Sequence, residues 1–380
     1  MIVSGLIQGG VFCQDLDDVI ISQVAAGNVI LHFIIGDAQN NTLSEFVETY
    51  YPDASGQIRI SGLSELMETY LKGSSLASIY NPTSGYSLSA MYVTLGVVVT
   101  QNNTQIGSFS QVFYPCINRT KVYPSTYQYF LSRHKERKVY PDQPIIFSHI
   151  SQRNLVVYCS AIYDNAGTIE QKSVAVPAAT LPGYTAMYQF TLTDIAILID
   201  TSADSLIDFT FNLYDYDNEE LTLLDKIRYV VDRNYTPERT TFLFKNVFGV
   251  PELLTMTGQN KRTAELDATY AWISRKYCKV STDLNTLHTI CSGWIDKETY
   301  ASVKDAIKSE EVYVLDGLNI ADQVTVTDID LDYETPRTTP LAAYLTYRVS
   351  NKVQETFSRV PEIEGEEDGI FDDTFDDTFE

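Results

Sequence analysis

Basic residues are scarce in this chain. Its 380 residues include 27 Lys and Arg against 50 Asp and Glu, which gives a formal net charge of −23 at pH 7. A protein that wraps nucleic acid needs clustered Lys and Arg to neutralise the phosphates. The charge balance therefore argues against a nucleic-acid partner. The excess of acid is densest at the C-terminus, where residues 361–380 contain ten acidic residues and no basic one.

Histidines and recognisable catalytic motifs are also few. The four His residues are widely scattered. The sequence has no Gly-rich phosphate loop, no Gly-x-Ser-x-Gly and no carboxylate pair that marks a catalytic cleft. Cys278, His288 and Cys291 are potential zinc ligands, but no fourth ligand follows at a usual spacing. We therefore expect no enzyme activity, no metal and no other cofactor.

Two acidic stretches are candidates for calcium binding. Residues 215–220 read Asp-Tyr-Asp-Asn-Glu-Glu, without the glycine and ligand register of a calcium loop. Asp328, Asp330 and Asp332 alternate along a predicted strand, where neighbouring like charges repel each other and discourage edge pairing. We interpret both stretches as solvent-facing, with calcium binding as the alternative.

Long apolar runs and closely spaced cysteines are missing as well. No segment reaches the length of a membrane-spanning helix, and the N-terminal MIVSGLIQGGVFC lacks the basic region of a signal peptide. The five cysteines are an odd number without tight spacing, which predicts buried reduced thiols rather than a disulfide framework. We expect no membrane partner and synthesis in the cytoplasm.

Aromatic residues, by contrast, are abundant. The chain has 26 Tyr and 17 Phe, and aromatic and β-branched residues favour strands and contact surfaces. Alternating apolar and polar runs recur along most of the chain. The sequence predicts a mainly β protein with two or three tandem β-sandwich-like domains, two short helices and an acidic C-terminal tail.

Composition and turn signals place the domain boundaries. We predict an N-terminal β-rich domain with one short helix, a connector with a basic cluster, a middle β-sandwich-like domain, a C-terminal β domain with a helix at 296–309, and the acidic tail. These span residues 1–116, 117–143, 144–235, 236–350 and 351–380, in that order.

Several local features are predicted in more detail. Hairpins are expected at 92–114 around Asn102-Asn103, at 155–176 around residues 164–167, and between 44–51 and 57–60, because each has turn residues between two strand-like runs. Slipped alternation after Val326 predicts a bulge near Asp328. Trp272 lies in a strongly alternating run and is expected to be buried.

One family resemblance covers much of the first 300 residues. FLFKNVFGVPELLTMTG, at residues 242–258, resembles a segment of virion proteins from tailed phages and prophages of Bacteroidetes, crAss-like phages included. YYPDASGQIRISGLSELMETYL and FLSRHKERKVYPDQP, earlier in the chain, are similar in texture. The resemblance implies a structural role in a tail, ring or baseplate.

Two segments are candidate partner-binding sites. The connector contains the densest basic cluster of the chain, Arg133, Lys135, Arg137 and Lys138, which is either a solvated loop face or a dock for an acidic neighbour. In the acidic tail, a Phe-Asp-Asp-Thr repeat places a phenylalanine at every fourth position. These are Phe371, Phe375 and Phe379. We expect them to fill apolar pockets on a neighbouring protein, with a floppy solubilising tail as the alternative.

The functional prediction is a structural virion component in the tail, ring or connector, or baseplate. Its partners would be other virion proteins and copies of itself, with a homo-oligomeric ring as the expected assembly. The alternative is a carbohydrate-binding or host-receptor-binding β protein, either a phage adhesin or a Bacteroidetes surface protein, because aromatic surfaces also suit sugar stacking. A glycoside hydrolase is a further possibility, and it would require two carboxylates within about 10 Å across a cleft.

Overall fold

The computed structural model describes residues 1–350 with some gaps. The gaps are residues 8, 40, 72–74, 83–84, 90, 117–118, 121–123, 125–127, 152–153, 178–182, 218–219, 235, 237, 274–275 and 332–341. At residues 89, 217, 266–267, 272–273, 277–278, 280–285 and 331 only the backbone is described. The predicted burial of Trp272 and the three tail phenylalanines therefore lie outside the described part of the chain.

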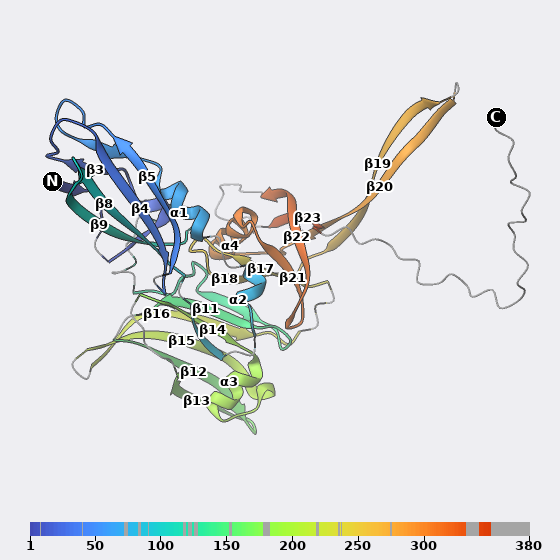
Figure 1. The fold of residues 1–380 in the computed structure, drawn as a ribbon. Coiled ribbons are helices and arrows are strands. Elements are labelled where there is room, and N and C mark those ends of the chain that lie inside the picture. Colours follow the sequence, from blue (N-terminus) through green and yellow to red (C-terminus); the bar gives the residue numbers. More distant parts are fainter. Residues whose placement is uncertain are drawn as a thin grey trace, which may run out of the picture. The chain divides into compact units, whose positions relative to one another are not determined.

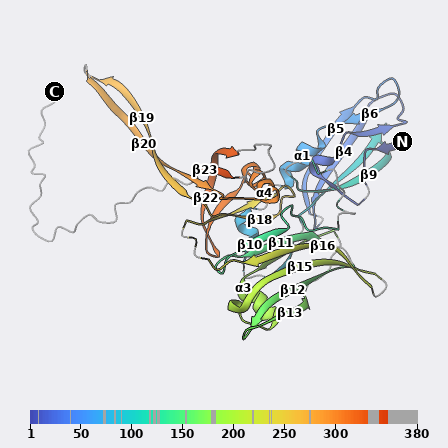
Figure 2. The same cartoon turned by 180° about the vertical axis from the view of Figure 1, so that it is seen from behind.

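Strands dominate the described residues, which confirms the predicted mainly β class. They form five sheets, and Figure 1 and Figure 2 show them from opposite sides. The compact unit ends at Ser350, where the sequence predicts the end of the folded region.

The N-terminal region is a two-layered β structure. Its larger sheet has the order β2-β9-β8-β4-β5 and its smaller sheet the order β1-β3-β6. The strands are β1 (Ile2–Ser4), β2 (Val11–Phe12), β3 (Val19–Ser22), β4 (Val29–Asp37), β5 (Thr42–Tyr50), β6 (Ile58–Ile60), β8 (Val93–Gln101) and β9 (Thr104–Tyr114). Alternate residues of β4 and β8 are buried in one hydrophobic cluster with β3, β6 and the helix α1 (Leu63–Leu71). The predicted helix and the Asn102-Asn103 hairpin are both confirmed, with φ of 49° and 60° at the two asparagines.

The predicted pairing of 44–51 with 57–60 is wrong. β5 pairs with β4, and β6 pairs with β3. The Asp53 carboxylate accepts hydrogen bonds from the backbone N–H of Ser55 and of Gln57. This Asx-type turn reverses the chain locally, but β6 then joins the smaller sheet rather than folding back on β5.

The middle region holds two sheets over one core. The larger has the order β10-β16-β15-β12-β13 and the smaller the order β11-β14-β7. Their strands are β7 (Gly85–Ser89), β10 (Glu136–Val139), β11 (Ile145–Ile150), β12 (Leu155–Asn165), β13 (Thr168–Ala175), β14 (Thr185–Phe190), β15 (Leu206–Asp217) and β16 (Glu220–Val231). Phe147 stacks on Tyr188, with ring centroids 4.6 Å apart, and both lie in the core between the sheets. The predicted β12–β13 hairpin is confirmed.

Two segments cross the predicted domain boundaries. β7 comes from the predicted N-terminal domain, yet it pairs with β14 of the middle region. The short helix α2 (Leu76–Ile79) buries Leu76 against Ile146 and Leu243, which belong to the middle and C-terminal regions. The connector also contributes β10, which pairs in parallel with β16. The elements α2, β7 and β10 are therefore integral parts of the neighbouring regions.

The sequence prediction missed two helices, α2 and the longer α3. α3 (Leu192–Ile199) follows β14 and begins with a capping box, in which Thr191 and Asp194 bond reciprocally to each other's backbone N–H. Asp200 ends the helix in the left-handed conformation, with φ of 63°. Its apolar residues resemble a buried strand when read by composition alone.

The C-terminal region is one seven-stranded sheet of order β18-β17-β21-β22-β23-β20-β19. Its strands are β17 (Thr240–Lys245), β18 (Pro251–Met256), β19 (Asn260–Ile273), β20 (Lys276–Cys291), β21 (Val312–Asp316), β22 (Asn319–Leu331) and β23 (Ala343–Val349). The outer strands β18 and β19 are separated by residues 257–259 only. Because so short a linker spans no more than about 14 Å, the sheet must curl so that the end of β18 lies near the start of β19.

The helix α4 (Lys297–Lys308) packs against β17 and β18 of this curled sheet. It begins as predicted, with Asp296 as N-cap accepting from the backbone N–H of Thr299 at 2.7 Å. The predicted bulge near Asp328 is confirmed by a register shift between Val326 and Asp328. Gly249, in the turn between β17 and β18, has a φ of 70°, which suits glycine.

Candidate functional site

The basic cluster of the connector lies at the junction between the middle and C-terminal sheets. Arg137, on β10, is 6% exposed and pairs with Glu252, on β18, at 2.7 Å. The carboxylate of Glu252, itself 4% exposed, also accepts from Ser132 Oγ at 2.9 Å and from Asn246 Nδ2 at 2.5 Å. Arg137 further donates to the carbonyl of His134. A buried charge pair of this kind is tolerated only when further hydrogen bonds satisfy both groups, as they do here.

The other three cations of the cluster have carboxylate partners within the chain. Lys135 lies 2.6 Å from Asp225, Lys138 lies 3.2 Å from Asp232, and Arg133 lies 3.7 Å from Asp305. Because Arg137 is buried with Glu252, it cannot contact an acidic neighbour, contrary to the expectation for the basic cluster. Arg133 and Lys138 remain accessible, and docking of a partner there stays a prediction.

A groove runs along this junction. It has a volume of about 450 Å³ and is bounded by β10 and β16 on one side and by β18 and the start of α4 on the other. Apolar and aromatic side chains, among them Tyr140, Tyr229 and Ile295, contribute much of its lining. Trp294 stands at its rim and is 85% exposed. An exposed Trp beside a partly apolar groove is a typical contact residue.

His134 lies in the same groove as a neutral side chain. Its Nε2 is 3.1 Å from the hydroxyl of Thr299 on α4. Burial lowers the pKa of His134 to about 4, and the nearby guanidinium of Arg137 acts in the same direction. A group with so low a pKa is uncharged at neutral pH, so this histidine bridges the junction as a hydrogen-bonding residue.

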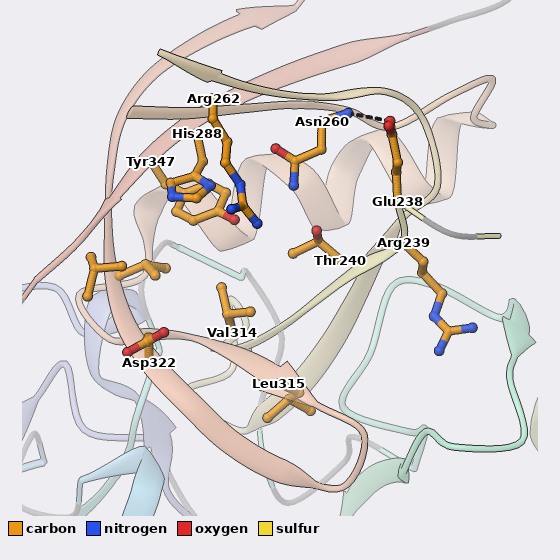
Figure 3. Close-up of a pocket in the computed structure, with 12 residues that line it drawn as sticks. Glu238, Arg239, Thr240, Asn260, Arg262, His288, Val314, Leu315, Asp322 and Tyr347 are labelled. Atoms are coloured by element: carbon orange, nitrogen blue, oxygen red, sulfur yellow. Dashed lines mark hydrogen bonds between the residues drawn. The ribbon is translucent and has the colours of Figure 1, made fainter. Parts of the chain in front are cut away.

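A second cavity opens inside the curled C-terminal sheet and is shown in Figure 3. Its volume is about 510 Å³, and six successive strands from β17 to β19 contribute to its wall. The ring of His288 stacks on Tyr347, with centroids 5.0 Å apart and planes at 14°. Arg262 lies beside this pair, and Asp322 reaches the cavity from β22 (Figure 3).

The charges in this cavity are mixed. Burial and the positive charge of Arg262 lower the pKa of His288, while Asp322 acts in the opposite direction. Glu238 accepts from the backbone N–H of Asn260 at 2.9 Å, and the buried Oδ1 of Asn260 has no hydrogen-bond partner. The described residues that line the cavity include neither serine nor cysteine. The arrangement suits a small polar ligand.

The structure also locates the residues that the sequence suggests as metal ligands, where their side chains are described. Within the described residues, no three His, Cys, Asp or Glu side chains gather closely enough to hold a metal ion. Of the zinc candidates, His288 stacks on Tyr347 and Cys291 Sγ accepts from the backbone N–H of Gly293, while the side chain of Cys278 lies outside the described part. Asp328 and Asp330 are exposed, as expected for solvent-facing residues.

The cysteines with described side chains are free thiols. Cys13 and Cys116 lie side by side with their sulfurs 3.8 Å apart, and both are buried. Burial raises the pKa of Cys159 to about 12, so that thiol is not reactive at neutral pH. Among the described helices, none is long and apolar enough to cross a membrane.

The sequence prediction missed the groove and the exposed Trp294 at its rim. Gly293, with φ of 70°, makes the bend that carries Trp294 out of the sheet after β20. A Trp next to a turn-forming glycine was the available signal. The partner of Arg137 had no such signal, because Glu252 is 115 residues further along the chain.

No protein-family model matches this sequence, and a search of the curated proteins finds no match either. The resemblance to virion proteins therefore stays a prediction that depends on the quoted segments alone.

Proposed function

We propose that this protein is a structural component of a tailed-phage virion, in the tail, ring or connector, or baseplate region. It is made in the host cytoplasm and acts by contacts with other virion proteins and with copies of itself. The proposal combines the sequence resemblance with one structural observation, the long hairpin of β19 and β20.

This hairpin has strands of 14 and 16 residues. The two strands pair with each other from Asn260↔Ile290 to Ile273↔Lys276, but β20 pairs with β23 only at residues 288–291. The outer part therefore extends as a two-stranded ribbon over roughly 35 Å, at about 3.4 Å per residue. It runs clear of the other strands in both views (Figure 1, Figure 2).

An isolated two-stranded ribbon is at best marginally stable in water. A ribbon that extends so far adds nothing to the hydrophobic core of its own chain. A partner protein that adds a strand to the ribbon or covers one of its faces would stabilise it. Other edge strands also expose apolar side chains that a partner could cover. These include Leu43 and Val47 on β5 and Ile169 on β13. Together these surfaces fit a protein that works by assembly.

The test is to shorten the hairpin. Residues 264–286 are replaced by Asn-Gly between the paired residues Thr263 and Leu287, a turn that suits a two-residue hairpin. Incorporation into particles and binding to neighbouring virion proteins should fall, while the thermal unfolding of the remaining protein stays close to that of the full chain. Unchanged incorporation by the folded, shortened protein would refute the proposal.

The acidic tail provides a second test of the same function. Truncation at Gly365 removes Phe371, Phe375 and Phe379. If the tail docks on a neighbour, truncation should weaken binding more at low salt than at high salt, because exposed charges are screened by salt. Equal binding by both proteins would leave the tail as a solubilising segment.

Glycan or host-receptor binding is the second candidate function. Trp294, exposed at the rim of the junction groove, is the observation that favours it, because sugar rings stack on exposed aromatic side chains. Glycan-array binding that is lost in Trp294→Ala, with unfolding unchanged, would support this function. The absence of any glycan signal from the intact protein would count against it.

A further inference from the structure

The hairpin of β15 and β16 ends in a surface that is apolar on one face and acidic on the other. Its register pairs Tyr216 with Leu221 and Tyr214 with Leu223, so these side chains share a face. Tyr216, Leu221 and Leu223 are 48%, 46% and 50% exposed. Asp215 and Glu220 occupy the alternate positions. We refer to residues 214–216 and 220–223 as the acidic hairpin end.

One edge of this hairpin end is open. β10 pairs with β16 only at Arg228–Val231, and no strand among the described residues pairs with the outer edge of β16 at residues 220–227. An unpaired edge offers backbone N–H and C=O groups to an incoming strand. The acidic hairpin end thus combines exposed apolar side chains, negative charge and an open edge.

The end of the β19–β20 hairpin has the opposite charge. Lys276 and Lys279 are exposed, and within the described part of the chain no carboxylate lies within ion-pair distance of either one. The register pairs Tyr270 with Lys279, and Tyr270 is 47% exposed. By sequence, residues 268–282 contain three basic and no acidic residues, in a chain whose net charge is −23. We refer to Tyr270, Lys276 and Lys279 as the basic hairpin end.

The two hairpin ends are complementary in three respects. One is acidic and the other basic, both expose tyrosine, and both have strand edges without a partner among the described residues. Charge complementarity between surfaces favours association and selects the right partner. An open strand edge adds main-chain hydrogen bonds to that attraction.

We infer that the basic hairpin end of one copy binds the acidic hairpin end of a second copy of this chain. The inference deepens the proposed assembly function and depends on it. Two different surfaces of the chain meet in this contact, so it is heterologous, and repetition of such a contact closes a ring or extends a filament. The partner is another copy because the chain itself supplies both halves of the contact.

Charge reversal tests this contact. One variant carries Lys276→Glu with Lys279→Glu, a second carries Asp215→Lys with Glu220→Lys, and a third combines all four substitutions. Lys261→Glu, an exposed position at the base of the same hairpin, is the matched control. Sedimentation velocity of the full-length chain over a range of concentrations measures self-association, and far-UV circular dichroism checks folding.

Each double variant should self-associate at least tenfold more weakly, because like charges then face each other, and tenfold corresponds to about 1.4 kcal/mol. The four-fold variant should recover self-association, since the signs are exchanged but still opposite. A mixture of the two double variants should also associate. High salt should weaken the native contact, while Lys261→Glu should leave it within about twofold of the unsubstituted chain.

Three results would overturn the inference. These are a native chain that stays monomeric, a four-fold variant that folds but does not associate, and a loss in Lys261→Glu as large as in Lys276→Glu with Lys279→Glu. Particle incorporation distinguishes failure of the contact between copies from failure of the proposed virion function. If the Lys276→Glu, Lys279→Glu variant still enters particles, the protein is a virion component whose hairpin binds something other than a second copy.

Discussion

Replacing Arg137 by Met should destabilise the protein through the carboxylate that it leaves behind. Methionine keeps most of the length and apolar contact of the arginine side chain but removes the guanidinium. Glu252 would then be a buried charge, 4% exposed, with only the Ser132 hydroxyl and the Asn246 amide as partners. Breaking one side of a buried ion pair lowers stability by about 3–5 kcal/mol.

A matched control is available on the same strand. Lys138 is adjacent to Arg137 on β10, but it is 69% exposed and its pair with Asp232 is at the surface. An exposed pair contributes roughly 0–1 kcal/mol, so Lys138→Met should have a small effect. Adding Glu252→Gln to Arg137→Met should recover at least half of the loss, because the stranded charge is neutralised while the amide still accepts hydrogen bonds.

Urea unfolding followed by tryptophan fluorescence and by circular dichroism measures these differences. The three variants and the native chain are compared at the same pH and salt. Equal losses in Arg137→Met and Lys138→Met would refute the buried pair as a stabilising element of the junction. No recovery on adding Glu252→Gln would show that lost packing, rather than the stranded charge, is responsible.

Three further outcomes are expected. Burial lowers the pKa of His134 and of His149 to about 4, below the value of about 6.5 in an unfolded chain, so the unfolded state binds more protons between these values. The free energy of unfolding should therefore fall as pH is lowered from 6.5 towards 4, by about 2 kcal/mol per histidine at pH 5. His149→Gln should flatten the pH dependence of the urea midpoint. An equally steep dependence in this variant would show that His149 is not a buried neutral histidine. Asp296→Ala removes the N-cap of α4 and should lower stability by about 1 kcal/mol, with Asp296→Asn as the control that stays near the native midpoint. Gly249→Ala should lower the melting temperature, because the φ of 70° is unfavourable for alanine and its Cβ would approach Pro115 Cβ to 2.7 Å; an unchanged melting temperature would show that this turn relaxes freely.

The sequence predicted the local features of the fold because their signals are local. Asn102-Asn103 specifies a turn with positive φ, and Asp296 specifies a helix start, whatever the rest of the chain does. The capping box of α3, Thr191 with Asp194, was equally readable. The sequence prediction nevertheless contains no helix at these residues.

Pairing between distant segments was not predictable in this way. Nothing within residues 85–89 specifies β14, about 100 residues later, as the partner of β7, since a five-residue strand of alternating polarity suits many sheet edges. The alternation of β5 likewise fits either neighbour in the chain, and only the whole sheet selects β4. These choices depend on packing that a linear pattern does not contain.

The candidate sites also combine features that a local sequence pattern reveals with features that depend on distant residues. A count of charges locates the basic cluster, but it does not reveal that Arg137 pairs with Glu252 or that Lys135 pairs with Asp225. The junction groove and the cavity behind His288 arise where several strands converge, so neither has a contiguous sequence signal.

The solution mass of the purified chain is the most direct test of whether the chain self-assembles. Mass photometry would compare the full-length protein, 42.8 kDa as a monomer, with the variant that carries Asn-Gly in place of residues 264–286. If the chain self-assembles through its long hairpin, the full chain should form concentration-dependent assemblies of several copies and the shortened chain should stay monomeric. Monomers for both proteins, or identical assemblies for both, would contradict it.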